Sequence, residues 1–163
     1  MALNAKNKEY TNNSNKIEQP VLDAGAYPGR VVQVIDLGVQ PQRPYKGEDK
    51  PPAQEIMVTY ELADEFIVDE EGNPVEDKPR WLSENFPLHN LQSDLAKSTK
   101  RYYAVDPDGV YDGDWTKLVG QPVMINITKD AGSGKNAGKV FNNVASTSSM
   151  RKKEADKLPA LQN

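Results

Sequence analysis

The sequence predicts a mainly β fold, a five-stranded Greek-key barrel with one helix between its third and fourth strands. Apolar residues recur with a period of two along five segments, one further segment has helical spacing, and Gly- and Pro-rich stretches separate them. With 163 residues, 37% of them hydrophobic, the chain has apolar material for one small core. We expect a flexible N-terminal arm over residues 1–22, the folded domain over 23–147 and a polar C-terminal tail over 148–163.

The first predicted strand, Arg30–Val39, is apolar on both faces. Val31 and Ile35 point to one side of the strand, and Val32 points to the other. A long, strongly curved strand that passes between two parts of a barrel buries both faces in this way. Gly38 is placed to supply the bend.

The second and third predicted strands follow a long proline-rich loop over residues 40–52. Gln54–Leu62 alternates cleanly, with Ile56 and Tyr60 among the inward positions, which is typical of a strand with one buried face. The third strand is Arg80–Leu88. An acidic hairpin connection joins the two strands.

The period then changes to that of a helix. Leu95, Thr99 and Tyr102 share one helical face, and Ser93 stands where an N-cap is expected. The helix ends by the turn that begins at Asp106.

Two further strands, Pro122–Lys129 and Lys139–Thr147, complete the predicted domain, and a short helix is expected within residues 151–158. Three strands, a helix and two more strands, with a curved first strand, are the arrangement of the OB-fold, a small five-stranded Greek-key barrel. Another small β-barrel or a split β-sandwich is the alternative.

Composition excludes several classes of protein. There are 20 Lys and Arg residues against 24 Asp and Glu, giving a net charge of −4, which argues against binding duplex DNA by bulk charge. Without cysteine and with one histidine, disulfide scaffolds, thiolate zinc sites and cysteine nucleophiles are excluded. No apolar run reaches the length of a membrane span and no signal region is visible, so we expect a soluble cytoplasmic protein without membrane contact.

Enzyme-like patterns do not fit their motifs. Gly132–Lys135 resembles a phosphate loop, but the required Gly and Ser or Thr are replaced by Lys129 and Asn136. The acidic run from Asp106 to Asp114 resembles a calcium loop only in composition, and His89 has no nucleophile or second ligand nearby. We therefore predict a non-enzymatic protein without metal or cofactor; the enzyme alternative is a metal-dependent nuclease using scattered carboxylates.

Basic and aromatic residues gather in separate stretches that an OB-fold places around its oligonucleotide-binding face. Single strands are bound there by bases that stack on rings and by phosphates that contact Lys and Arg. The alternative is that the rings fill the core and the bases are ordinary solvated surface. The predicted nucleic-acid-binding residues are Arg43, Tyr45, Lys46, Arg80, Trp81, Lys100, Arg101, Tyr102, Lys135, Lys139 and Phe141.

The acidic connection supports a second function class. Residues 64–77 hold seven carboxylates and no base, and leaving them out changes the net charge from −4 to +3. A solvated hairpin tip accounts for this in the simplest way. The alternative function is a protein–protein module, a virion component or host-directed adaptor, that uses this acidic hairpin as its contact surface.

The sequences of several predicted strands and of the helix resemble those of a known family. The segments AYPGRVVQVIDLG, EIMVTYEL, RWLSENFPLH, KSTKRYYAVDP and LVGQPVMINIT are similar to the single-stranded-DNA-binding proteins of tailed bacteriophages that are built on one OB-fold. The resemblance covers roughly residues 26–150. It implies a protein, monomeric or a small homo-oligomer, that coats and protects single-stranded DNA during phage replication and recombination in the host cytoplasm. Replication or recombination proteins would be its partners.

The same resemblance implies that Tyr45, Arg80, Trp81, Phe141 and the lysines around them carry base stacking and phosphate contacts. One departure concerns the C-terminus. Many single-strand binders end in an acidic tail that recruits partners, whereas this chain ends in the mixed, locally basic segment MRKKEADKLPALQN. Recruitment of partners by a tail of that kind is therefore not implied.

Overall fold

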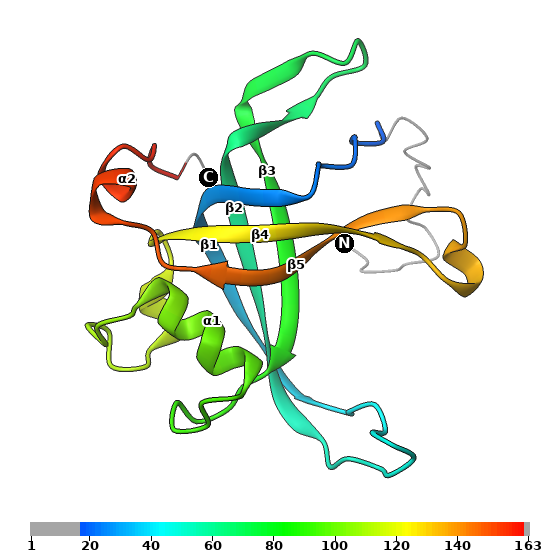
Figure 1. The fold of residues 1–163 in the computed structure, drawn as a ribbon, viewed down its shortest axis with the longest axis vertical. Coiled ribbons are helices and arrows are strands. Elements are labelled where there is room, and N and C mark those ends of the chain that lie inside the picture. Colours follow the sequence, from blue (N-terminus) through cyan, green and yellow to red (C-terminus); the bar gives the residue numbers. More distant parts are fainter. Residues whose placement is uncertain (1–16, 162–163) are drawn as a thin grey trace, which may run out of the picture.

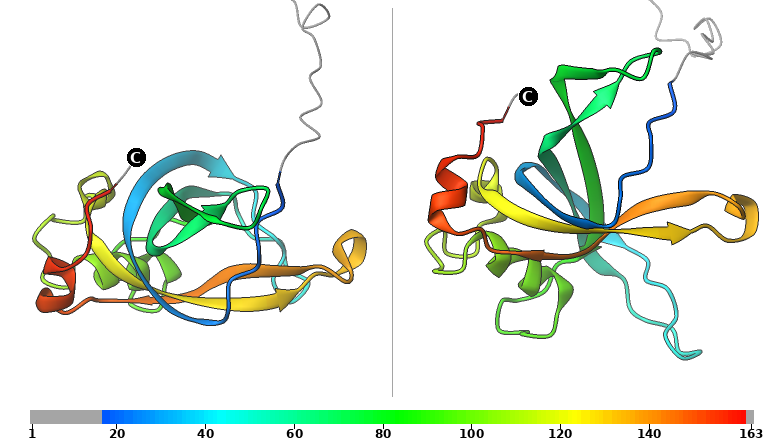
Figure 2. Two further views of the ribbon diagram at one scale, coloured as in Figure 1. Left: turned by 90° about the horizontal axis from the view of Figure 1, so that it is seen from above. Right: turned by 45° about the horizontal axis from the view of Figure 1, so that its top comes forward.

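The computed structural model describes residues 17–161. Its main element is a five-stranded antiparallel sheet with the strand order β3-β2-β1-β4-β5, curled into a half-barrel (Figures 1 and 2). The predicted mainly β architecture is confirmed. The strands are β1 (Gly25–Gln40), β2 (Ala53–Val68), β3 (Pro74–Pro87), β4 (Pro122–Ala131) and β5 (Val140–Ser148), and the α-helices are α1 (Lys97–Val105) and α2 (Lys152–Asp156).

Helix α1 lies between β3 and β4, as expected, but it begins later than the sequence predicts. The residue before it is Ala96, in extended conformation and without a side-chain cap, so the prediction of Ser93 as N-cap is wrong. Residues 90–96 form successive turns instead, with the Asn90 carboxamide oxygen accepting from the backbone N of Gln92 at 2.8 Å. Leu95 is 88% exposed and does not belong to the buried face of the helix.

Strand β1 bends because its pairing with β2 shifts register twice, between Val31 and Gln33 and between Asp36 and Gly38. Such bulges increase the local twist of a strand. Gly38 has φ +72°, a backbone conformation that favours glycine, so it supplies the expected bend. Gly29 is required for a different reason: a Cβ atom there would lie 2.5 Å from the carbonyl oxygen of Glu61, so β1 can approach β2 this closely only with glycine.

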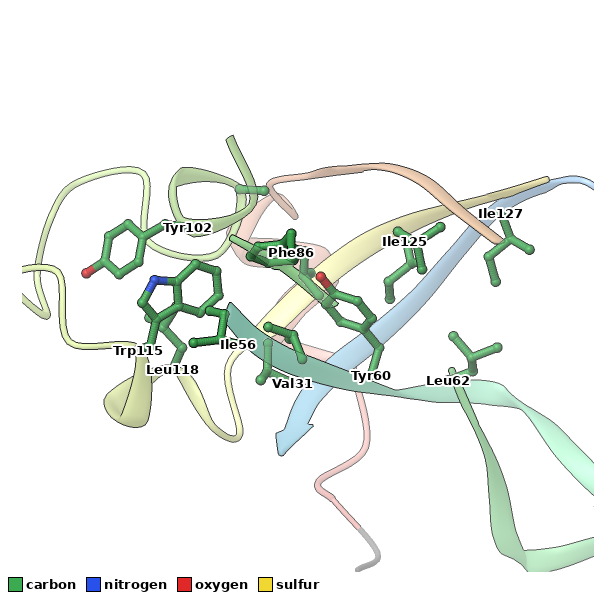
Figure 3. Close-up of a cluster of buried hydrophobic side chains, with 14 of the residues drawn as sticks. Val31, Ile56, Tyr60, Leu62, Phe86, Tyr102, Trp115, Leu118, Ile125 and Ile127 are labelled. Carbon is green, nitrogen blue, oxygen red and sulfur yellow. The ribbon is translucent and has the colours of Figure 1, made fainter. Parts of the chain in front are cut away.

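The core lies inside the curl of the sheet and extends to α1 (Figure 3). Its aliphatic part comes from Val31 on β1 and from alternate positions of β2 and β4. At the α1 end, the ring of Trp115 packs against Phe86 and Tyr102, with centroids 5.9 and 5.5 Å apart. The fully buried large side chains are Tyr60, Tyr102, Leu62, Leu118, Ile125, Ile127, Val31, Val58 and Val123.

A buried ion pair connects the two edge strands of the half-barrel. In the described residues β3 and β5 are the edges of the sheet, and α1 packs between them. The Glu84 carboxylate on β3 accepts from Arg101 Nε at 2.8 Å, from Lys97 Nζ at 3.1 Å and from the Tyr60 hydroxyl at 2.8 Å. Arg101 Nη2 also donates to the carbonyl oxygen of Ala145 on β5 at 3.4 Å. Arg101 therefore holds β3, α1 and β5 together.

The folded domain extends further toward the N-terminus than the expected boundary. Residues 1–16 of the predicted arm lie outside the described residues, but residues 17–22 contact the sheet. The Gln19 carboxamide bonds the backbone N and O of Val68 at 2.8 and 3.1 Å. The Asn142 carboxamide bonds the backbone N and O of Leu22 at 2.8 and 2.9 Å, and Leu22 is buried. This segment therefore links the β2–β3 hairpin to β5.

The predicted C-terminal tail contains the expected short helix, α2, and its described part continues onto the sheet. Arg30 on β1 donates to the carbonyl oxygens of Leu158 and Pro159 at 3.1 and 2.9 Å. None of the helices within residues 17–161 combines the length and hydrophobicity needed to cross a bilayer.

Candidate nucleic-acid interface

Three segments project from the half-barrel: the β1–β2 loop (residues 41–52), the acidic arm (residues 64–77) and the β4–β5 loop (residues 132–139). The acidic arm consists of the end of β2, the turn over residues 69–73 and the start of β3. In Figure 1 the β1–β2 loop (cyan) projects downward from the half-barrel, and the β4–β5 loop (orange) projects to the right. Figure 2 shows both loops from two further directions. The acidic arm leaves the opposite end of β2 and β3 from the β1–β2 loop (Figure 1). The predicted basic and aromatic positions are distributed over these connections and the strands at their base.

The tip of the β1–β2 loop is an ordered turn. Tyr45 and Glu48 form a β-bridge with backbone hydrogen bonds of 2.9 and 3.0 Å, and Lys46 and Gly47 between them have φ angles of 52° and 78°. This is the left-handed geometry of a two-residue hairpin turn, which non-glycine residues adopt at a cost. The turn presents the ring of Tyr45, which is 59% exposed.

Positive charge surrounds that ring. The ammonium groups of Lys46 and Lys50 lie 5.3 and 4.8 Å from the centroid of Tyr45, within the range of cation–π attraction. Arg43 is exposed on the same loop. The loop therefore combines a stacking surface with cations, although Glu48 and Asp49 offset part of the charge.

Trp81 lies on the outer face of β3 and is 47% exposed. Its indole Nε1 donates to Glu61 Oε1, 3.1 Å away on the neighbouring strand. The rest of this face is polar, because Thr59 is hydrogen-bonded to Ser83 at 2.7 Å and other cross-strand pairs follow. Since the face carries carboxylates, positive charge for phosphates has to come from the loops at its ends.

An open groove of about 440 Å³ adjoins the Trp81 ring at the base of the acidic arm. Lys78 is exposed at its edge, and Ile67 contributes an apolar wall. The groove is lined by Gln19, Ile67, Lys78, Pro79, Arg80 and Trp81.

The third exposed ring is at the start of β5, next to the β4–β5 loop. Phe141 is 42% exposed, and its ring packs over Gly132, where a Cβ atom would lie 2.8 Å from Phe141 Cε2. The Gly132 amide donates to the carbonyl oxygen of Lys139 at 2.8 Å, which closes the loop. Lys135 and Lys139 are exposed beside it.

Two predicted contact residues, Arg101 and Tyr102, are corrected by the structure. Arg101 is buried, because its guanidinium pairs with Glu84 on β3 and donates to the Ala145 carbonyl oxygen on β5. It thereby joins β3, α1 and β5. The Tyr102 ring is fully buried; its hydroxyl donates to Asp106 at 2.7 Å and accepts from the Gly113 amide at 2.7 Å. Burial and the Asp106 hydrogen bond raise the pKa of Tyr102 to about 12. Neither side chain presents a surface to a ligand.

Arg80 and Lys100, which the sequence predicts as nucleic-acid contacts, are not placed beside the exposed rings as free cations. Arg80 is half-buried, its Nη1 donates to the Pro20 carbonyl oxygen at 2.7 Å, and burial lowers the pKa of its guanidinium. It therefore holds the N-terminal segment against the sheet. Lys100 is exposed, but α1 lies across the barrel from the β4–β5 loop (Figure 1).

The acidic run that resembles a calcium loop has a structural role. The Asp106 carboxylate accepts from the backbone N of Val110 at 2.8 Å and of Tyr111 at 3.0 Å, besides the Tyr102 hydroxyl. Burial opposes its ionisation, but these hydrogen bonds outweigh burial and lower the pKa of Asp106. The carboxylate thus shapes the turn after α1.

Sequence reasoning did not identify Arg30 and Glu61 as parts of this surface. Strand pairing connects both residues to Trp81: Arg30 on β1 is opposite Glu61 on β2, and Glu61 is opposite Trp81 on β3. Alternation along each strand indicates that these residues face outward, but only the register places them in one row.

No protein-family model matches this chain, and no curated protein and no solved structure is significantly similar to it.

Proposed function

We propose that this protein is a non-enzymatic, OB-fold-type protein that binds single-stranded DNA with little sequence preference. The observation that carries the proposal is the exposure of three rings, Tyr45, Trp81 and Phe141, on three separate hairpin elements with lysines close to each. Large exposed aromatic side chains beside cations are the combination that single-strand binding requires.

The arrangement of elements supports the OB-fold part of the proposal. The strand order β3-β2-β1-β4-β5, with α1 between β3 and β4, is that of an OB barrel whose edge strands β3 and β5 approach each other. In that fold, the β1–β2 and β4–β5 loops flank the oligonucleotide-binding face of β2 and β3. Here Tyr45 is on the β1–β2 loop and Phe141 is at the start of β5, next to the β4–β5 loop. Trp81 is on β3, at the base of the acidic arm.

In the proposed mechanism the aromatic rings bind the bases and the cationic side chains bind the phosphates. Bases stack on the exposed rings, each contributing about 1–3 kcal/mol without regard to base identity. Phosphates contact Arg43, Lys46, Lys78, Lys135 and Lys139, and release of counterions makes the affinity fall with salt. A single barrel of this kind covers roughly 4–16 nucleotides. A role in phage replication or recombination, inside the host cell, rests on the resemblance of the strand segments alone.

The test is a titration of the protein with oligo-dT and with a matched duplex, followed by tryptophan fluorescence at low and moderate salt. We expect quenching by the single strand, a weak response to the duplex and loss of affinity with salt. A Trp115→Phe variant serves as the matched control, because Trp115 is in the core and its loss leaves Trp81 as the reporter. Equal binding of both nucleic acids, or no binding to either at low salt, would reject the proposal.

A protein–protein module is the second candidate, favoured by the construction of the acidic arm. Asp69 Oδ1 accepts from the backbone N of Glu71 and of Asn73, both at 2.9 Å, so the tip is a formed turn with exposed carboxylates at Glu70 and Glu71. The arm also stands clear of the barrel (Figure 1). If this candidate is right, a Glu70→Gln/Glu71→Gln variant loses binding to a basic partner protein while the parent chain has no DNA affinity.

A further inference from the structure

One row of side chains crosses three strands on the outer face of the sheet. Arg30 on β1 pairs in register with Glu61 on β2, and Glu61 pairs in register with Trp81 on β3. Directly opposed residues on antiparallel strands have Cβ atoms about 4.5–5.5 Å apart, so the three side chains are neighbours. The link between the last two is a hydrogen bond, from Trp81 Nε1 to Glu61 Oε1 at 3.1 Å.

The first residue of this row holds the C-terminal part of the chain. The Arg30 guanidinium donates to three backbone carbonyl oxygens: Gly120 at 2.7 Å, Pro159 at 2.9 Å and Leu158 at 3.1 Å. Two of these acceptors belong to residues 158–160, which we call the C-terminal strap. A planar guanidinium with several fixed donors is suited to such a clamp, and a lysine is not.

The strap also lies beside the second residue of the row. Pro159 and Ala160 line a narrow seam, with almost no free volume, together with Glu61 and Pro79. Pro79 is buried, and it also lines the open groove beside Trp81. The strap therefore lies beside Glu61, and Pro79 borders both the seam and the groove.

From these contacts we infer that Arg30 and Glu61 are positioning residues for the Trp81 ring, and that the C-terminal strap belongs to the stacking site through them. Glu61 holds the indole by its N–H, the strap keeps Glu61 buried, and Arg30 keeps the strap in place. Release of the strap then loosens the ring and weakens the grip on a single strand. The consequence for DNA rests on the proposed function, whereas the consequence for the ring does not.

The experiment uses the full chain carrying Trp115→Phe, so that Trp81 is the only tryptophan. Acrylamide quenching of Trp81 in the free protein measures how firmly the ring is held, and oligo-dT titration measures binding. Glu61→Leu removes the acceptor, and we expect stronger quenching and about fivefold weaker binding, the effect of one hydrogen bond. Glu61→Gln retains an acceptor oxygen and is expected to restore both values.

Arg30→Gln tests the strap. We expect it to raise Trp81 quenching and to speed amide hydrogen exchange at Leu158 and Leu161, although Arg30 does not touch the indole. Glu55→Leu is the matched control for ring mobility, because it breaks side-chain hydrogen bonds outside the row, from Asn85 and from Gln42, both at 3.0 Å. Thermal melting establishes that each variant is folded.

Unchanged quenching in both Glu61→Leu and Arg30→Gln would overturn the inference, as would an equal increase in Glu55→Leu. If the parent chain fails to bind oligo-dT, the proposed function is lost, and the quenching measurements still decide whether the row positions the ring.

Discussion

Two regions of this protein have the same basic and aromatic composition and different roles. Residues 100–103 on α1 read Lys-Arg-Tyr-Tyr, and the β1–β2 loop and the β4–β5 loop with the start of β5 combine Tyr45 or Phe141 with lysines. In α1 the arginine and the first tyrosine are buried, whereas the rings of Tyr45 and Phe141 are exposed. The comparison teaches that residue type identifies candidates for a binding surface, and that only the packing around them decides which remain available.

The reason lies in the gap between the edge strands. β3 and β5 approach without forming a ladder in the described part of the chain, and α1 fills the space between them. The inner face of α1 has two tasks. The Arg101 guanidinium pairs with the carboxylate of Glu84, and the Tyr102 ring packs against Trp115. Among residues 17–161 no second layer covers the β1–β2 and β4–β5 loops, and the rings of Tyr45 and Phe141 stay partly in solvent.

The largest expected effect is on the stability of the α1 region. Arg101→Ala removes the main partner of Glu84 and leaves a buried carboxylate with fewer partners, which costs about 3–5 kcal/mol of unfolding free energy. Denaturant unfolding measures this loss. Lys100→Ala on the exposed side of the same helix is the control, expected to change stability by less than about 0.5 kcal/mol. Equal effects of the two variants would show that Arg101 is not structural.

The next prediction concerns Asp106, which is buried at the C-terminal end of α1. Asp106→Ala leaves two backbone N–H groups and the Tyr102 hydroxyl without their acceptor, costing about 2–3 kcal/mol. Because the pKa of Asp106 is lowered in the folded state, its contribution is present above the unfolded pKa and is lost as pH falls through the folded pKa. Unfolding curves between pH 6 and acid should therefore converge for the parent and Asp106→Ala. Curves that stay parallel would contradict the assignment.

On the loop side, the comparison is tested by removing exposed rings one at a time. Trp81→Ala is expected to weaken oligo-dT binding by about 1–3 kcal/mol, roughly 5- to 150-fold in Kd, with smaller losses for Phe141→Ala and Tyr45→Ala. Tyr103→Ala is the matched control, since Tyr103 is 41% exposed but belongs to α1. Fluorescence anisotropy of labelled dT follows all four variants. A loss in Tyr103→Ala as large as in Trp81→Ala would move the interface to the helix.

The smallest expected effect is that of single lysines, read from the salt dependence of binding. Lys135→Ala and Lys139→Ala should each reduce the slope of log K against log salt by about 0.7, the value for one phosphate on a single strand. Lys100→Ala should leave the slope unchanged because α1 lies away from the β4–β5 loop. Titrations at several salt concentrations separate these outcomes. A reduced slope in Lys100→Ala alone would place the phosphate path over α1.

Much of the fold follows from local patterns. The strands predicted as Gln54–Leu62 and Pro122–Lys129 lie within β2 and β4, because alternation of apolar residues is a local property of a half-buried strand. The start of α1 was predicted wrongly at Ser93, because the turns over residues 90–96 depend on contacts such as that of the Thr99 hydroxyl with the Asn90 carbonyl oxygen at 3.3 Å. Such a contact is not visible in propensities.

Some residues of the candidate site could also be predicted from local sequence, and others depend on the folded sheet. Exposed rings at Tyr45 and Phe141 agree with their position in, or directly after, loops rich in Gly, Pro and Lys, which the sequence displays directly. Tyr102 and Tyr103 are adjacent in sequence and about 100° apart around a helix, so one faces inward and the other outward. Which of them is buried depends on the position of the gap between β3 and β5, a property of the folded sheet.

By itself, the sequence determined the mainly β class, the order of strands and helix, the acidic arm and the placement of lysines and rings in or next to two loops. These are local properties, set by side-chain periodicity, turn residues and charge. Tertiary structure alone decided that Arg101 and Tyr102 serve the core, that Arg80 holds the N-terminal segment, and that Arg30, Glu61 and Trp81 form one row. Strand register and the closing of the half-barrel bring together residues far apart in the chain, and no local pattern records which residues will meet.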